Sequence, residues 1–112
     1  MTPTLRAGLL IVPVLALALL APTSAKADRI DGNWCRGLAH LAIDGPTIIT
    51  PGGTRMSGDY DRHGFRYVVP TGEPGAGATI SMVQLSEQLM QLSSSAKPGD
   101  VQDWTRCQRQ IS

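Results

Sequence analysis

The segment Ile30-Asp31-Gly32-Asn33-Trp34-Cys35 decides how this chain folds. It contains the first of only two tryptophans and the first of only two cysteines, and the second of each lies near the other end, at Trp104 and Cys107. A large aromatic ring beside a thiol at both ends of a short chain predicts that the two ends meet. We therefore interpret the segment as a closure of one end of the fold. Its glycine permits a turn, its tryptophan fills the core, and its cysteine ties the first strand to the last element.

Residues 1–27 have the pattern of a cleaved secretory signal peptide. Arg6 supplies the positive start, residues 7–21 are almost wholly apolar, and Ala25-Lys26-Ala27 offers the small-x-small pattern of a signal-peptidase site. The apolar stretch is shorter than the roughly 20 residues that a membrane-spanning helix needs, and an uncleaved anchor is the alternative. We predict a periplasmic or secreted protein whose mature chain, residues 28–112, is one small domain with no stable membrane span.

Two cysteines in an exported chain are expected to pair. Cys35 and Cys107 lie 72 positions apart, so a disulfide between them encloses nearly the whole mature domain. The chain-entropy model gives the closure of such a loop about 4–4.7 kcal/mol, which is comparable to the whole stability of a small domain. Two free buried thiols are the alternative, and a metal site is disfavoured because no histidine pattern accompanies the cysteines.

The charge balance and the absence of motifs exclude several classes of function. Without Arg6 and Lys26, the mature chain keeps eight of its ten basic residues against nine acidic ones. Such a balance does not favour nucleic acid or an anionic membrane as partner. We expect no cofactor, because no haem-attachment or phosphate-loop pattern occurs. No serine lies in a nucleophile motif, so catalysis is the least favoured class and no catalytic residue is named.

Glycine and proline divide the mature chain into short runs. Turn signals recur about every 8–14 residues, which is typical of an all-β meander. Asp44-Gly45 between two apolar runs predicts a tight hairpin, and Gly58 within a run predicts a bulge or a close approach of the backbone. The expected strands cover residues 33–36, 38–43, 47–50, 54–60, 65–69, 78–85 and 89–93, and residues 101–108 form a last strand or a single helical turn.

Residues 78–93 fit either a hairpin or a helix. As a helix, Val83, Leu85, Leu89 and Leu92 fall partly on one stripe, and the many Met, Gln, Leu and Glu residues favour it. The β-rich neighbourhood favours a hairpin, which we predict. The fold is then a small antiparallel β-barrel or strongly curved meander sheet of six to eight short strands. The expected core is Trp34, Ile43, Ile48, Tyr60, Phe65, Tyr67, Val69, Ile80, Met82, Leu85 and Leu92.

The densest polar cluster is the run from Asp59 to His63. Two carboxylates, an arginine and an imidazole that titrates near neutral pH are typical of a functional site, and a solvated hairpin tip explains the same residues. No further oxygen ligands follow at calcium-loop spacing, so we expect no metal. His40 fits better as a strand residue, and the methionines fit better as core. The candidate binding residues are Asp59, Asp61, Arg62 and His63.

Asp31-Gly32-Asn33-Trp34 resembles the Gly-x-Trp opening of small β-barrels of the lipocalin and avidin type, and that of secreted bacterial barrel inhibitors of proteases. The resemblance implies that Trp34 lies under the barrel floor and closes one end. The 85 mature residues are few for a full eight-stranded barrel, which argues against a roomy cavity. Residues 43–46, 50–54 and 58–63 are similar to a group of small exported proteins of alphaproteobacteria, a resemblance that implies no particular activity.

These observations predict a non-enzymatic protein-interaction module of the bacterial envelope, with a hydrolase inhibitor as one form of it. The motivation is a disulfide-stapled scaffold with long loops at 70–77 and 94–100 and no catalytic cluster. An envelope protein is then the expected partner. The alternative is a small-ligand carrier, based on the Gly-x-Trp opening and on the aromatic residues 60, 65 and 67. A metal-dependent enzyme that uses the polar cluster is the least favoured function.

Overall fold

Nine antiparallel strands make up residues 29–108, the range that the structure, a computed structural model, describes. No helix occurs in this range, so none could cross a membrane, and the hairpin predicted for residues 78–93 is confirmed. The predicted signal peptide, residues 1–27, lies outside the described residues. The strands are β1 (Gly32–Arg36), β2 (Ala39–Asp44), β3 (Thr47–Ile49), β4 (Arg55–Ser57), β5 (Asp59–Asp61), β6 (Gly64–Val68), β7 (Thr79–Gln84), β8 (Leu89–Ser94) and β9 (Gln102–Arg106).

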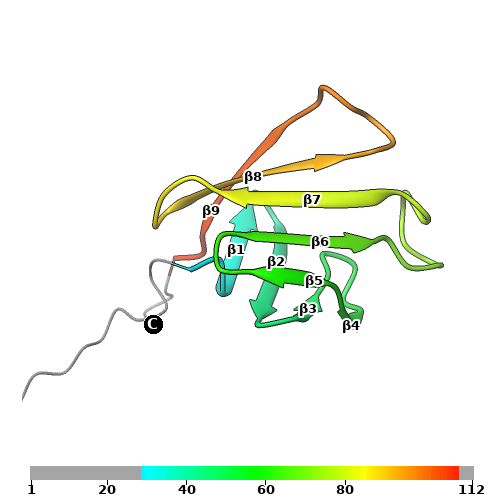
Figure 1. The fold of residues 1–112 in the computed structure, drawn as a ribbon. Helices are drawn as coiled ribbons and strands as arrows, with labels where there is room; N and C mark the ends of the chain where they lie inside the picture. Colours follow the sequence, from blue (N-terminus) through cyan, green and yellow to red (C-terminus); the bar gives the residue numbers. More distant parts are fainter. Residues whose placement is uncertain (1–28, 109–112) are drawn as a thin grey trace, which may run out of the picture.

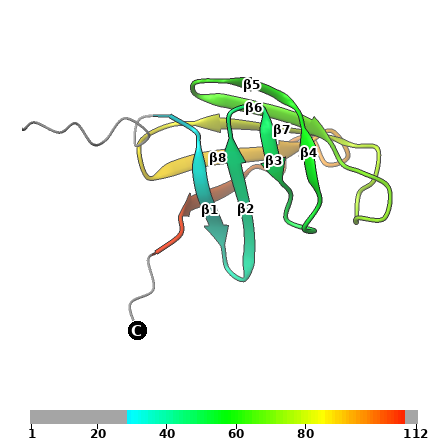
Figure 2. The same cartoon turned by 90° about the horizontal axis from the view of Figure 1, so that it is seen from below.

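The strands form one meander that curves into a nearly closed barrel (Figures 1 and 2). Their order in the sheet is β4-β3-β2-β1-β9-β8-β7-β6-β5, so the first strand pairs with the last. The two outermost strands of this order, β4 and β5, are separated in the chain by Gly58 alone. They behave as one bent strand, whose first half pairs with β3 and whose second half pairs with β6. The prediction of a small antiparallel barrel is confirmed.

Gly58 is the bend that lets one strand serve both halves of the barrel. Its backbone N–H donates to the carbonyl oxygen of Pro46 at 2.9 Å. A Cβ atom at Gly58 would lie 2.5 Å from the carbonyl oxygen of Arg66 and 2.6 Å from the ring of Phe65, so a larger residue would force the two strands apart. The close backbone approach predicted at this glycine is confirmed.

Alternation of side chains along the strands fills the barrel. Nine of the eleven residues predicted as core are buried, and Tyr60 packs against them while partly exposed. Leu85 was predicted wrongly: the inward positions of β7 are Ile80, Met82 and Gln84, so the next residue points outward and is 53% exposed. The core also contains Met90, as expected for the methionines, and three residues that the prediction left out: Ile30, Leu41 and Trp104.

One end of the barrel, the closed end, is sealed by the segment before β1 and by the end of β9. Trp34 is fully buried and donates from Nε1 to the carbonyl oxygen of Ile30 at 2.8 Å. The guanidinium of Arg106 lies over its ring, 4.0 Å from the ring centre, and donates to the backbone carbonyls of Arg29 and Asp31. Trp34 therefore closes one end, as the Gly-x-Trp resemblance implied.

Gly32 leaves room for that guanidinium. Its φ of 121° is a conformation that residues with a side chain rarely adopt. A Cβ atom there would lie 2.6 Å from Nη1 of Arg106. The glycine and the tryptophan of the Gly-x-Trp opening thus serve one purpose, which is to seat an arginine from the last strand.

A buried carboxylate completes the closed end. Asp31 is 4% exposed and accepts hydrogen bonds from the hydroxyl of Tyr60 at 2.5 Å and from the backbone N–H of Gly45 at 2.8 Å. Burial by itself would raise the pKa of Asp31, but these hydrogen bonds outweigh it and hold the pKa below its ordinary value. The segment before β1 is therefore fixed to β5 and to the β2–β3 turn.

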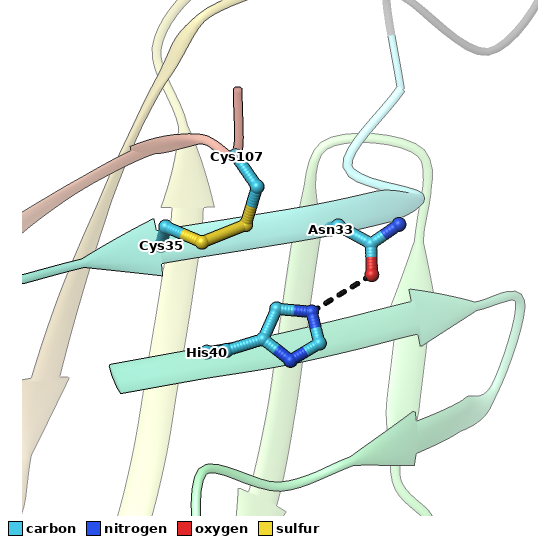
Figure 3. The surroundings of a disulfide bond; sticks show 4 residues. All are labelled: Asn33, Cys35, His40 and Cys107. Atoms are coloured by element: carbon cyan, nitrogen blue, oxygen red, sulfur yellow. Dashed lines mark hydrogen bonds between the residues drawn. A yellow bond between two sulfur atoms is a disulfide. The ribbon is translucent and has the colours of Figure 1, made fainter. Parts of the chain in front are cut away.

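The predicted disulfide between Cys35 and Cys107 is present and joins the two ends of the fold (Figure 3). The ladder between β1 and β9 has only two residue pairs, and the backbone N–H of Cys107 extends it by donating to Asn33 at 3.1 Å. The side chain of Asn33 contacts His40 on β2, which is exposed, at 2.8 Å (Figure 3). The disulfide thus reinforces the pairing that closes the barrel.

Replacing both cysteines, Cys35→Ala with Cys107→Ala, should lower the free energy of unfolding by about 4 kcal/mol, because the bond closes a loop of 72 residues. Urea unfolding of the oxidised protein and of the double variant, followed by tryptophan fluorescence, measures the difference. Reducing the wild type should give the same loss, and equal midpoints for all three samples would contradict the prediction.

Gly58→Ala should destabilise the barrel by about 1–3 kcal/mol, the usual cost of adding a carbon where packing leaves no space. Gly64→Ala is the matched control, because a Cβ there meets its nearest atom at 3.4 Å, an ordinary contact distance. Thermal unfolding of the two variants tests the comparison. An equal shift in Tm for both would show that Gly58 is not required at the bend.

Candidate functional site

The opposite end of the barrel, the open end, contains a cavity of about 650 Å³. Because the strands alternate in direction, the β1–β2, β3–β4, β6–β7 and β8–β9 connections all lie at this end. The small size of the mature chain argued against a roomy cavity. The barrel instead packs its closed end with large side chains, such as Trp34 and Leu41, and leaves the open end hollow.

Four adjacent strands supply the apolar wall of the cavity. Tyr67 on β6 lies opposite Ile80 on β7 in the ladder, and Leu92 on β8 lies opposite Gln102 on β9. The same alternation that builds the core turns these side chains inward near the strand ends. The apolar wall consists of Tyr67, Val69, Ile80, Leu92 and Trp104.

The rim of the cavity comes mainly from loops and includes a few polar side chains. The β6–β7 loop contributes Glu73, and the β8–β9 loop contributes the exposed Lys97. Gln102 accepts a hydrogen bond at Oε1 from the indole N–H of Trp104 at 3.1 Å, so the indole is already satisfied. An apolar interior with a few polar groups at its edge is the usual composition of a small-molecule site.

Glu73 ties the β6–β7 loop to the β3–β4 turn. Its Oε2 accepts hydrogen bonds from the hydroxyl of Thr50 at 2.6 Å and from the hydroxyl of Thr54 at 2.5 Å. A Cβ atom at Gly52 would lie 2.6 Å from that oxygen, so the glycine makes room for the carboxylate. The hydrogen bonds from Thr50 and Thr54 hold the pKa of Glu73 below its ordinary value. This contact, the Glu73 contact, fixes one side of the cavity mouth.

Tyr67 contributes a hydroxyl group to the otherwise apolar wall of the cavity. The residue is 6% exposed, and no hydrogen bond to its hydroxyl is formed by any group within residues 29–108. Burial, with a smaller contribution from the negative charge of Glu73, raises the pKa of Tyr67 to about 12. The hydroxyl therefore stays protonated, and able to donate, throughout the physiological pH range.

The four candidate residues of the polar cluster lie at the closed end, away from this cavity. All are exposed on β5 or on the β5–β6 turn, where Asp61 accepts at Oδ1 from the backbone N–H of His63 at 2.9 Å. Asp59 and Asp61 line a depression of about 260 Å³ on the outer face. His63 lines a different one of about 310 Å³, and Arg62 contributes its carbonyl oxygen to a hydrogen bond from Ile30.

The structure thus places Asp59 and Asp61 at one surface depression and His63 at another. Across residues 29–108, no group of three or more His, Cys, Asp or Glu residues is arranged to hold a metal ion. Sequence reasoning named Tyr67 as a core residue and as an aromatic of the carrier hypothesis, but it missed Glu73, Lys97, Gln102 and Trp104 as cavity residues. A cavity at this end could have been predicted from the inward-facing strand residues that adjoin the long loops at 70–77 and 94–100.

Comparison of the chain with protein-family models, with curated proteins and with solved structures finds no match. The class is therefore defined by the fold and the site alone. It is a small antiparallel β-barrel, stapled by a disulfide, with one sealed end and one open, apolar cavity.

Glu73→Gln should weaken the fold in a pH-dependent way. Because the pKa of Glu73 is lowered in the folded state, its ionised form stabilises the protein above the unfolded pKa, and this contribution disappears as the pH falls through the folded pKa. The Tm of the variant should be below that of the wild type at pH 7, and the two should converge at acid pH.

Differential scanning calorimetry across this pH range measures the effect. Asp100→Asn, which removes an exposed carboxylate from a neighbouring loop at the same end, is the control and should leave the Tm almost unchanged. If Glu73→Gln and the wild type kept a constant difference in Tm at every pH, the assigned role of the carboxylate would be wrong.

Proposed function

We propose that this protein binds a small, largely apolar ligand in the cavity at the open end of the barrel, as an exported carrier or binding protein. The observation that carries the proposal is the cavity itself, about 650 Å³ with a wall of aromatic and aliphatic side chains. Binding sites for small molecules usually have volumes of about 300–1,000 Å³ and a composition of this kind.

The fact that so small a domain leaves a cavity unfilled supports the proposal. A domain of this size has little apolar surface to bury. A cavity at its open end therefore lowers the stability relative to a barrel that larger side chains fill. The chain makes up part of the difference with a disulfide between its first and last strands. A ligand that fills the cavity would pack against Ile80, Leu92 and Trp104 and add contacts that the protein lacks there, and it would stabilise the folded state by mass action.

We place this function in the periplasm or outside the cell. The disulfide between Cys35 and Cys107 is consistent with an oxidising compartment. The signal-peptide pattern of residues 1–27 supports export. In an aqueous compartment a poorly soluble molecule needs a protein that covers its apolar surface, which is what an open barrel of this kind can provide.

A protein-interaction or inhibitor-like module is the second candidate, and one observation favours it. Leu38, at the tip of the β1–β2 turn, is fully exposed, and Val101 in the β8–β9 loop is 52% exposed at the same end. These two side chains would give a partner protein apolar surface to cover. Pull-down from a periplasmic extract with the wild type and with Leu38→Ser tests this role, which requires a stoichiometric partner that the variant loses.

The ligand-binding proposal predicts that the mature, oxidised protein binds the neutral fluorescent probe phenylnaphthylamine saturably, with a blue shift in its emission. Ile80→Phe, which adds volume to the cavity wall, should weaken binding at least severalfold. Val83→Phe is the matched control, because Val83 lies on the same strand and is 53% exposed on the outer face. The absence of saturable binding to the wild type would refute the proposal.

A further inference from the structure

The polar groups around the cavity differ in whether the protein already satisfies them. The carboxylate of Glu73 accepts hydrogen bonds from Thr50 and Thr54, and the indole N–H of Trp104 donates to Gln102. The hydroxyl of Tyr67 has no such partner among residues 29–108. Within this range the fully buried side-chain atom that lacks a partner is Gln84 Oε1, so the Tyr67 hydroxyl is instead open to the cavity and can donate to a ligand there.

The ring of Tyr67 is held in place, so its hydroxyl has a fixed position. The ring packs against that of Phe65 at a centroid distance of 6.4 Å and an interplanar angle of 59°, and the residue lies opposite Ile80 in the ladder. It forms part of the cavity wall. A preorganised donor of this kind costs little entropy when a ligand accepts from it.

The electrostatics around this hydroxyl select the kind of acceptor. Burial and the charge of Glu73 keep the phenol protonated, with a pKa of about 12, so it acts as a neutral donor. The same negative charge disfavours a second carboxylate placed at Tyr67, because like charges repel. An uncharged oxygen, such as that of an ester, amide or ketone carbonyl, meets no such opposition.

We propose that the ligand of this cavity is an uncharged apolar molecule with a carbonyl group, and that the Tyr67 hydroxyl donates a hydrogen bond to the carbonyl oxygen. The inference rests on the proposed ligand-binding function and adds the chemical class of the ligand. The competing hypothesis is that the ligand is an anion whose charged group is bound by Lys97 at the rim.

The test compares two neutral probes of similar size on the full oxidised protein. Prodan is a naphthalene ketone whose emission reports hydrogen bonding to its carbonyl, whereas phenylnaphthylamine has no carbonyl. Tyr67→Phe should weaken Prodan binding about 3- to 10-fold, as expected for the loss of one hydrogen bond, and should shift the emission of bound Prodan to the blue. It should leave the affinity for phenylnaphthylamine unchanged.

Tyr60→Phe is the control, because it removes the other tyrosine hydroxyl, which is bonded to Asp31 at the closed end. It should alter neither affinity. Binding of both probes with no effect of Tyr67→Phe on Prodan would overturn the inference while leaving the proposed function standing. Failure of the wild type to bind either probe would overturn the proposed function itself.

The charge of the ligand needs a separate comparison, for which cis-parinaric acid and its methyl ester are suitable fluorescent probes. The methyl ester should bind more tightly than the free acid, and Lys97→Gln should not increase this preference. If the free acid bound more tightly and Lys97→Gln weakened it, the ligand would be an anion held at the rim, and the inference would be wrong.

Discussion

The packing of the Arg106 guanidinium on the Trp34 ring is the interaction on which the rest of the barrel depends. The arginine comes from the last strand and the tryptophan from the first, so their contact brings the chain ends together. The guanidinium also binds the carbonyls of Arg29 and Asp31, which draws the preceding segment across the barrel end. Burying a charge is costly unless hydrogen bonds replace those of water, and the backbone carbonyls supply that replacement.

Because the closed end holds the first and last strands together, the open end can contain a cavity rather than a filled core. At the closed end, Asp31, Tyr60 and Arg106 form a connected set of hydrogen bonds around a filled core. At the open end, two long loops surround a cavity, and Glu73 is the side chain that ties the β6–β7 loop to the β3–β4 turn. The filled core and the cavity thus lie at opposite ends of one small sheet.

Glycine and proline spacing predicted most of the strands, because turns leave a local chemical signature, and the paired Trp and Cys residues predicted the closure. The spacing predicted six to eight strands rather than nine, because residues 54–60 were expected as one strand where Gly58 separates β4 from β5, and it left the last element open between a strand and a helical turn. The candidate site was not predictable in the same way. Tyr67 and Leu92 read as ordinary core residues, since a cavity arises from how inward side chains and distant loops meet. The cluster from Asp59 to His63 drew attention because charge is visible in a sequence and concavity is not. Leu85 shows a further limit of sequence patterns. Neighbouring residues of a strand face opposite sides, so an error of one position placed Leu85 inside and Gln84 outside, whereas the structure has the reverse.

The disulfide makes the barrel a covalent ring. Cys35 and Cys107 are 72 residues apart, yet their Cα atoms lie 5.0 Å from each other, so the backbone between them forms a closed circuit. A single cut in an exposed connection, such as the loop between β8 and β9, would therefore leave both pieces joined and paired within one sheet. The same proximity allows a circular permutant, in which a short linker joins the native ends and new termini open in that loop. Continuity of the sheet, rather than the order in which its strands are connected, then determines whether the barrel holds together.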